Sequence, residues 1–264
     1  MSTNPFLAKS TLAYELPPFE LINESHYLEA FYAGMEEQLL EIDAILASTE
    51  VSFENTIEAM ERSGAILNRV LNVFYNKSSS DTNDQVDAIE AEIAPKLAAH
   101  SDAIRLNPQL FTRIKNLFEN SSQLNEEQAW LVQRYFRDFA HAGAELSEAS
   151  RNRVKQINEE LSSLQTQFSK KLLADTNDLA VAVDSEQELD GLSPNQIAAC
   201  KAAAESRGLN DKWLITMMNF TGHPLLDSLK NRALREKVMV NSLLKGDRDN
   251  ENDTKEVLLN IVTL

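Results

Sequence analysis

The sequence predicts a mainly α-helical protein: an antiparallel helical bundle with a long central helix and a minor two-stranded β element. Three observations support this fold class. Apolar residues recur at steps of three and four over most of the chain. This pattern is longest and uninterrupted between Ser147 and Asn177. Only two short segments, residues 179–183 and 212–216, have the period of a strand.

The segment from Ser147 to Asn177 is expected to form the central helix, around which the shorter helices pack. Polar residues fill the faces between its apolar positions, so we expect one side of it to be buried. At 1.5 Å per residue the helix would be roughly 40 Å long, the length of a domain. Its apolar positions are Val154, Ile157, Leu161, Leu164, Phe168 and Leu172.

Residues 1–22 are expected to form an extended N-terminal arm. The segment has no helical periodicity and contains three prolines, which disfavour a helix in the residues before them. We expect the arm to lie on the surface of the protein and to be held there by its larger apolar side chains. These expected anchors are Phe6, Leu7, Tyr14, Leu16 and Phe19.

A helical domain is predicted over residues 23–177. Its first helix extends from Asn23 to about Ser48, and a second begins near Ser52 and continues to about Phe74. Gly64 falls on the apolar stripe of the second helix, where a missing side chain would let a neighbouring helix approach closely. A weak point in the helix is the alternative interpretation.

The later helices of this domain are marked by their boundary residues. A loop is expected at 77–81, followed by a helix that contains Pro95. Asparagine, serine and threonine side chains cap helix N-termini, most effectively with a glutamine three positions later. The expected caps are Thr82 with Gln85, Asn107 before Pro108, and Asn125 with Gln128 in a helix ending near Gly143.

The last predicted region, residues 178–264, combines a small sheet with helices. The strands 179–183 and 212–216 are separated by a helix from Pro194 to about Arg207, with Ser193 and Gln196 as a capping box. A helix-turn-helix stretch follows over 222–246, and a final helix begins near Asn252. Because its apolar residues reach the chain end without a cap, we infer a truncation. These residues are Val257, Leu258, Ile261 and Leu264.

Composition excludes several classes of protein. The chain has 264 residues, of which 43% are hydrophobic and 25% charged, enough for a sizeable core. Its net charge of −16 argues against a nucleic acid or an anionic membrane as partner. The single cysteine, Cys200, excludes an internal disulfide framework. No apolar run is long enough to span a membrane, and residues 1–12 lack a signal-peptide core, so we expect a cytoplasmic location.

The titratable residues give no pattern of a metal or catalytic site. The histidines at 26, 100, 141 and 223 are far apart, and none belongs to a His-Glu-x-x-His motif. His141 and Glu145 are four residues apart; we favour a surface pair or a helix-dipole contact over metal binding there. His223, before Pro224, is expected to be a turn or cap residue. The prediction for both catalytic and metal-binding residues is therefore none, and substrate-binding residues stay unknown.

The remaining candidates are also interpreted as structural. Cys200 lies on an alanine-rich helix without a nearby histidine, so we expect a buried small hydrophobe and not a nucleophile. The seven glycines form neither a G-x-G-x-x-G motif nor a P-loop. Acidic pairs such as Glu36-Glu37 and Glu126-Glu127 have the character of solvated helix faces.

A series of short motifs, weak singly but specific in their order and spacing, extends over nearly the whole chain. These motifs are Asn4-Pro-Phe-Leu7, Leu16-Pro-Pro-Phe19, His26-Tyr27, Phe53-Glu-Asn-Thr-Ile57, Ser63-Gly64, Lys212-Trp-Leu-Ile215 and Ala233-Leu-Arg-Glu-Lys237. The series is similar to the N-terminal portion of bacterial peptidyl-dipeptidases (dicarboxypeptidases) of the thimet oligopeptidase and neurolysin family.

The resemblance implies a parent enzyme more than twice as long, whose C-terminal half contains a zinc site. That parent would be a zinc metallopeptidase that cleaves dipeptides from the C-terminus of short unstructured peptides, with this portion as one wall of a deep channel. This chain lacks the His-Glu-x-x-His half, so the resemblance predicts that it is inactive alone and binds no zinc. The competing hypothesis is a self-sufficient helical interaction module that never had a catalytic half.

Overall fold

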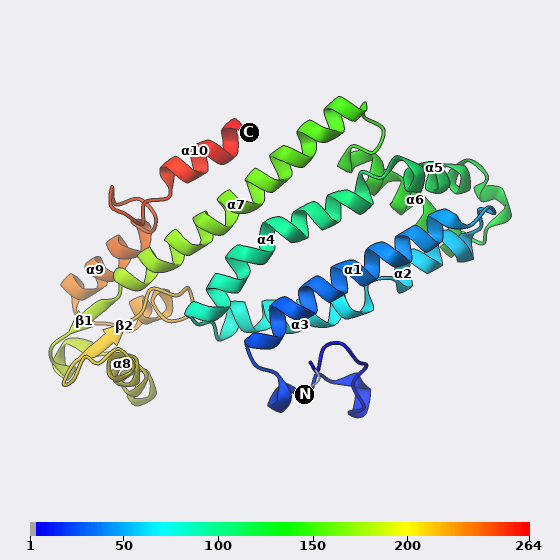
Figure 1. Cartoon of the computed structure of the whole chain (residues 1–264). Coiled ribbons are helices and arrows are strands. Elements are labelled where there is room, and N and C mark those ends of the chain that lie inside the picture. Colours follow the sequence, from blue (N-terminus) through cyan, green and yellow to red (C-terminus); the bar gives the residue numbers. More distant parts are fainter. Residues whose placement is uncertain (1–3) are drawn as a thin grey trace. The chain divides into compact units, whose positions relative to one another are not determined.

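The computed structural model describes residues 4–264, and the predicted mainly α fold class is confirmed (Figure 1). A single antiparallel sheet of two strands, β1 (Val181–Val183) and β2 (Trp213–Ile215), lies among these residues. The α-helices are α1 (Ser25–Ala47), α2 (Ala59–Arg62), α3 (Ala65–Ser80), α4 (Asp84–Arg105), α5 (Pro108–Glu119), α6 (Glu126–Ala142), α7 (Glu148–Asp178), α8 (Pro194–Ser206), α9 (Arg232–Leu243) and α10 (Lys255–Thr263).

The chain divides into two compact units, with the boundary inside α7 between Ser163 and Leu164. Helices α1 to α6 belong to the first unit, and the sheet with α8, α9 and α10 belongs to the second. Each unit has its own hydrophobic core, and the first unit has two. The two units are described separately below.

Helices α1 and α3 lie side by side, and with α4 they form the first core of the first unit (Figure 1). Gly34 makes this close approach possible, because a Cβ atom at that position would lie 2.6 Å from the backbone nitrogen of Leu67. Phe74 sits between two aromatic rings, with centroids 5.1 Å from Tyr27 and 5.2 Å from Phe31 in edge-to-face geometry. Tyr27 and Phe31, in the first half of α1, are therefore buried.

Helices α5 and α6 pack against the C-terminal part of α1 and form the second core. The rings of Phe118 and Phe136 stack with centroids 4.3 Å apart. Both helices begin at the predicted caps: Asn107 accepts hydrogen bonds from two backbone N–H groups, and Asn125 forms a capping box with Gln128. Gly143 ends α6 in the left-handed conformation, as expected from its position.

The predicted continuous helix from Ser52 to Phe74 is wrong at its middle. A π-helical turn, Glu54–Glu58, leads into α2, and the chain breaks at Ser63 and Gly64 before α3 begins. Gly64 has φ of +73°, a conformation that glycine adopts without strain. It also lies close to α1, since a Cβ there would be 2.7 Å from the Gln38 side chain. Close approach was expected, but the break was not.

Two carboxylates on α1 explain why α3 can begin at this break. Glu41 accepts a hydrogen bond from the Gly64 N–H at 2.7 Å, and Glu37 accepts one from the Ile66 N–H at 3.1 Å. The N-terminal N–H groups of a helix have no partner inside the helix, and negative charge is stabilised there. The cap of α3 thus comes from another helix, which no local motif indicates.

Two further boundaries differ from prediction. The expected loop at 77–81 is helical as far as Ser80, because α3 continues through it. The cap of α4 is Asn83, whose side chain accepts from the N–H groups of Gln85 and Val86. Thr82 instead donates to the Asp87 carboxylate. The predicted box of Thr82 with Gln85 is therefore wrong by one residue.

The N-terminal arm is held by fewer anchors than predicted. Phe6 is buried against Tyr27, and its carbonyl accepts a hydrogen bond from Arg69 at 3.1 Å. Asn4, which periodicity does not single out, is 5% exposed and donates to the His26 carbonyl at 2.8 Å. The other four expected anchors are exposed: Leu7, Tyr14, Leu16 and Phe19.

Helix α7 has the predicted extent but not the predicted burial. All of its expected apolar positions, from Val154 to Leu172, are only half-buried. The buried side chain on this helix is the carboxylate of Asp175. None of the hydrophobic cores contains a residue of α7. The helix is therefore long and regular without being the centre of packing among the described residues.

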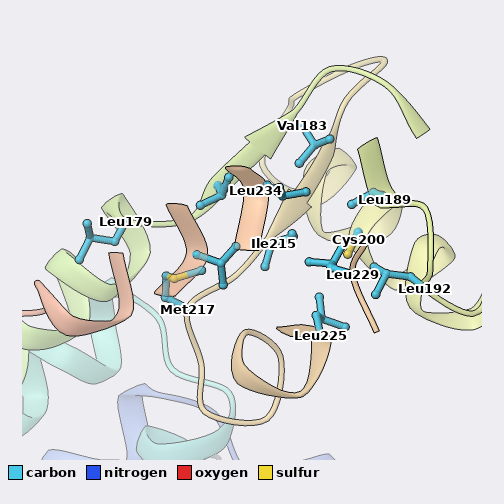
Figure 2. Packing of buried hydrophobic residues seen from close by; sticks show 12 residues of the cluster. Leu179, Val183, Leu189, Leu192, Cys200, Ile215, Met217, Leu225, Leu229 and Leu234 are labelled. Atoms are coloured by element: carbon cyan, nitrogen blue, oxygen red, sulfur yellow. The ribbon is translucent and has the colours of Figure 1, made fainter. Parts of the chain in front are cut away.

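The second unit folds around its sheet (Figure 2). Ala182 pairs with Leu214, and Val181 and Ile215 are both buried on the core side. Ser193 and Gln196 form the predicted capping box at the start of α8. As Figure 2 shows, the core also receives leucines from the segment after β2 and from α9. Its members include Leu179, Val183, Leu189, Leu192, Met217, Leu225, Leu229 and Leu234.

Candidate functional site

The residues that sequence analysis considered for chemistry do not come together. His26 Nδ1 accepts a hydrogen bond from the N–H of Asn23, just before α1, while His100 is buried and His141 and His223 are exposed. Helix α6 ends at Ala142, before Glu145, so the two side chains of the His141 pair do not share a helix face. Within residues 4–264, no group of three or more His, Cys, Asp or Glu side chains could hold a metal ion.

Cys200 has the predicted environment. It is 6% exposed and belongs to the core of the second unit, beside Leu189 and Leu229 (Figure 2). Burial raises the pKa of its thiol, which lowers the fraction of the reactive thiolate. The side chain is therefore a small hydrophobic core residue.

The most organised polar structure is a latch in the second unit, formed around Asp175. The carboxylate is fully buried and accepts hydrogen bonds from the Gly246 N–H at 2.7 Å and from Arg248 Nε at 2.7 Å. Burial raises the pKa of Asp175, but Arg248 and the Gly246 N–H offset this effect, so the pKa lies below its ordinary value. The carboxylate is therefore ionised and joins α7 to the loop before α10.

The same loop is fixed at its other end, where α10 begins. Thr254 is buried, and both its N–H and its hydroxyl donate to the Gly246 carbonyl, at 2.9 and 3.0 Å. The ammonium group of Lys255 contacts the carboxylates of Asp247, Asp249 and Asp253. These acidic groups thus have a cation from the protein itself, and α10 starts from a loop with a defined conformation.

Helix α10 presents apolar side chains to solvent from this fixed start. Val257 is buried, whereas Leu258, Leu259 and Val262 are 49%, 65% and 76% exposed. The prediction that Val257, Leu258, Ile261 and Leu264 form the uncovered face is therefore wrong in detail. The exposed apolar residues lie on a different side of the helix from the predicted one. We call Leu258, Leu259 and Val262 the α10 apolar face.

Sequence reasoning missed two buried charged residues that fix local structure. Asp175 follows Phe168 and Leu172 at helical spacing, and Arg113 falls between Leu110 and Leu117 on the apolar side of α5. Arg113 donates to the carbonyls of Ser48 and Glu50 and so holds the loop after α1. A charge at an apolar position of a helix was the signal that could have found both.

Comparison with known proteins shows that the chain is similar to part of several peptidases. The chain is 35% identical over its whole length to the dipeptidyl carboxypeptidases of Salmonella typhimurium and Escherichia coli. It is also 26% identical over 239 residues to oligopeptidase A of Escherichia coli. The predicted resemblance to the thimet oligopeptidase family is confirmed. No family model matches the chain.

The alignment covers nearly all of this chain but less than half of each of these peptidases. Almost all of this chain is aligned with the two dipeptidyl carboxypeptidases, but it spans about 39% of the length of each. The share is similar for oligopeptidase A of Escherichia coli, at 34%.

Among the described residues, no helix is long and apolar enough to cross a membrane.

Proposed function

We propose that the chain is the N-terminal, non-catalytic part of a zinc-dependent peptidyl-dipeptidase that removes dipeptides from the C-terminus of short unstructured peptides. The observation that carries the proposal is the 35% identity over the whole chain to dipeptidyl carboxypeptidases of which the chain spans 39%. Its placement at the N-terminal side is supported by the motifs between Asn4 and Phe19, which resemble the start of the family. We propose that this part forms one wall of a substrate channel.

Zinc does not fit the residues of this chain, because residues 4–264 contain no group of side chains that could hold it. The metal would be held by the remaining part of the enzyme, where it would activate the water that attacks the peptide bond. We propose that this remaining part is the principal partner of the chain. A cytoplasmic location is proposed from the single cysteine, which is typical of a reducing compartment. The charge of −16 argues against nucleic acid and anionic membranes.

We propose further that the α10 apolar face contacts the remaining part. Full burial of a leucine or valine side chain stabilises by about 1.5–3 kcal/mol, so a partner that covers this face would gain several such contributions. The latch at Asp175 and the contacts of Lys255 hold the helix start in place. A face that is already positioned costs little conformational entropy when it binds.

The first test is the coding sequence beyond Leu264. The proposal expects it to continue into a His-Glu-x-x-His motif and a later glutamate. A natural stop codon directly after Leu264 would favour the alternative, a self-sufficient helical interaction module.

The second test measures association with the part encoded downstream. Changing Leu259 and Val262 to serine together should weaken binding of the chain to that part at least tenfold, measured by calorimetry. The matched control is Leu40→Ser, since Leu40 is 63% exposed on α1 in the first unit. Equal binding by both variants would exclude the α10 apolar face as the contact.

A further inference from the structure

The N-terminal arm carries a loop with an apolar outer surface. The arm is anchored by the buried residues Asn4 and Phe6, and it returns to the first core of the first unit at Ile22. Residues 7–21 lie between these anchors, beside the N-terminal end of α1 (Figure 1), and we call them the arm loop. Exposed apolar side chains gathered on one segment are characteristic of a surface that contacts another molecule. The large apolar side chains of the arm loop are between 39% and 97% exposed: Leu7, Leu12, Tyr14, Leu16, Phe19 and Leu21.

Contacts within the arm loop give it a defined conformation and leave these side chains uncovered. Ser10 Oγ accepts a hydrogen bond from the Leu12 N–H at 3.2 Å and donates one to the Leu16 carbonyl at 2.7 Å. Lys9 and Glu15 form an ion pair of 2.6 Å across the same turn. The loop contains one lysine and two glutamates, a formal charge of −1, whereas the whole chain carries −16. An apolar surface of low charge is thus already ordered before a partner binds, which lowers the entropy cost of binding.

The backbone at the tip of the arm loop has a conformation that favours glycine. Tyr14 and Glu15 have φ of +57° and +58°, and this left-handed region carries an energetic cost for side chains of their size. Positions of this kind persist where the surrounding structure enforces them, and they concentrate at sites of function. The ring of Tyr14 is 97% exposed, so contacts within the described part of the chain do little to offset this cost. A partner that binds the ring would offset it.

A groove of about 990 Å³ is lined by residues from both ends of the arm loop. Half of the loop's large apolar side chains line this groove, namely Leu7, Leu12 and Leu21. The other half are exposed outside it. A small molecule that filled the groove would leave this second set in water, whereas the surface of a folded protein can cover both sets. Because burial of each apolar side chain adds to the binding free energy, the loop is better suited to a protein partner than to a small ligand.

We propose that the arm loop is a docking surface for the remaining part of the enzyme, separate from the α10 apolar face. The inference rests on the proposed function, which supplies the occupant. The chain spans about 39% of the dipeptidyl carboxypeptidases that it matches, so most of a polypeptide of that length lies outside it. The arm loop belongs to the first unit and the α10 apolar face to the second. Each unit thus has a surface of its own for the same partner, and on the arm loop Tyr14 and Phe19 are the aromatic anchors.

Nitration of tyrosine by tetranitromethane tests whether Tyr14 is covered. Its ring should react readily in the chain of 264 residues and be protected in the full-length protein, as measured at each tyrosine by peptide mass spectrometry. Tyr32, 40% exposed on α1, is the internal control and should react alike in both proteins. Equal reactivity of Tyr14 in both would overturn the proposal. Protection that appears in the chain alone and grows with its concentration would assign the arm loop to a second copy, and would equally overturn it.

A variant of Tyr14 separates binding from folding. Asparagine tolerates the left-handed conformation better than tyrosine, so Tyr14→Asn should unfold at the same denaturant concentration as the parent chain or at a higher one. It should nevertheless bind the part encoded downstream about tenfold more weakly in calorimetry, as should Phe19→Ser. The matched control is Leu40→Ser, which changes a side chain 63% exposed on α1 and should bind as the parent chain does.

The outcomes distinguish this inference from the proposed function. Parent-like binding by Tyr14→Asn and Phe19→Ser, together with weak binding by the variant of Leu259 and Val262, would overturn the arm loop as a docking surface and leave the proposed function intact. No binding by the parent chain itself would overturn both. Equal weakening by Leu40→Ser would indicate a general effect of surface polarity and contradict the assignment to the arm loop.

Discussion

Helices α1 and α10 are both amphipathic, yet their apolar residues have different surroundings. On α1, Tyr27 and Phe31 are at most 2% exposed, because α3, α4 and the N-terminal segment cover them. On α10, Val257 is buried but Val262 is 76% exposed. The periodic pattern is similar in the two helices, so it predicts that a helix forms but not which of its apolar residues are buried. Burial additionally requires a covering element, which α10 has on one side only.

The largest expected effect concerns the covered helix. Gly34→Leu should destabilise the chain by about 3 kcal/mol, because even a Cβ would overlap the Leu67 backbone. Urea unfolding followed by circular dichroism measures the difference. The control is Ala44→Leu at an exposed position of the same helix. Similar midpoints for the two variants would refute the close contact between α1 and α3.

The next effect concerns how α10 is attached. Asp175→Ala should destabilise by about 2–3 kcal/mol, since it removes a buried carboxylate and leaves Arg248 and the Gly246 N–H without their acceptor. Asp178→Ala is the control: this carboxylate also contacts Arg248 but is largely exposed, so its loss should cost less than about 1 kcal/mol. Hydrogen exchange in residues 246–254 should rise in the first variant only; the same rise in both would argue against a latch at Asp175.

A smaller effect separates close packing from backbone strain at glycine. Gly64 and Gly208 have φ of +73° and +70°, so alanine meets a similar backbone cost at both positions. At Gly64 a Cβ would also lie 2.7 Å from the Gln38 side chain, whereas at Gly208 nothing lies within 4 Å. Gly64→Ala should therefore cost about 1 kcal/mol more than Gly208→Ala in denaturant unfolding. Equal costs would mean that Gln38 moves aside freely.

The smallest effect is a pH dependence of the unfolding free energy that arises from the buried ring of His100. Burial lowers the pKa of His100 in the folded chain, so the unfolded chain binds the proton more readily. The associated stability is fully present above about pH 6.5 and is lost as the pH falls through the folded pKa. Between pH 5 and 7, His100→Gln should therefore show a flatter dependence of unfolding free energy on pH than the parent. A slope unchanged in His100→Gln would exclude this group as the cause.

The sequence predicted those parts of the fold that depend on nearby residues. The caps at Asn107, Asn125 and Ser193, the extent of α7 and both strands follow from local patterns and agree with the structure. The break at Gly64 was missed because Glu37 and Glu41, far away in sequence, cap α3. Burial of α7 was overestimated because periodicity identifies an apolar face but not its covering partner.

The candidate site could be predicted only in outline. An unfinished apolar helix near Leu264 was expected, but its exposed side was assigned to the wrong residues, since the direction of α10 depends on the loop held by Asp175. A cavity beside His100 in the first unit could not be predicted from any local sequence pattern. Its lining residues come from five helices, and only their packing brings them together.

Peptidase activity tests the central claim most directly, namely that this chain needs a further part for catalysis. A fluorogenic peptide with a free C-terminus is incubated with the chain of 264 residues, with zinc, and with or without the part encoded downstream. We predict no turnover and no stoichiometric zinc for the chain alone, and dipeptide release when both parts are present. Zinc-dependent turnover by the chain alone, above a heat-inactivated control, would contradict the account.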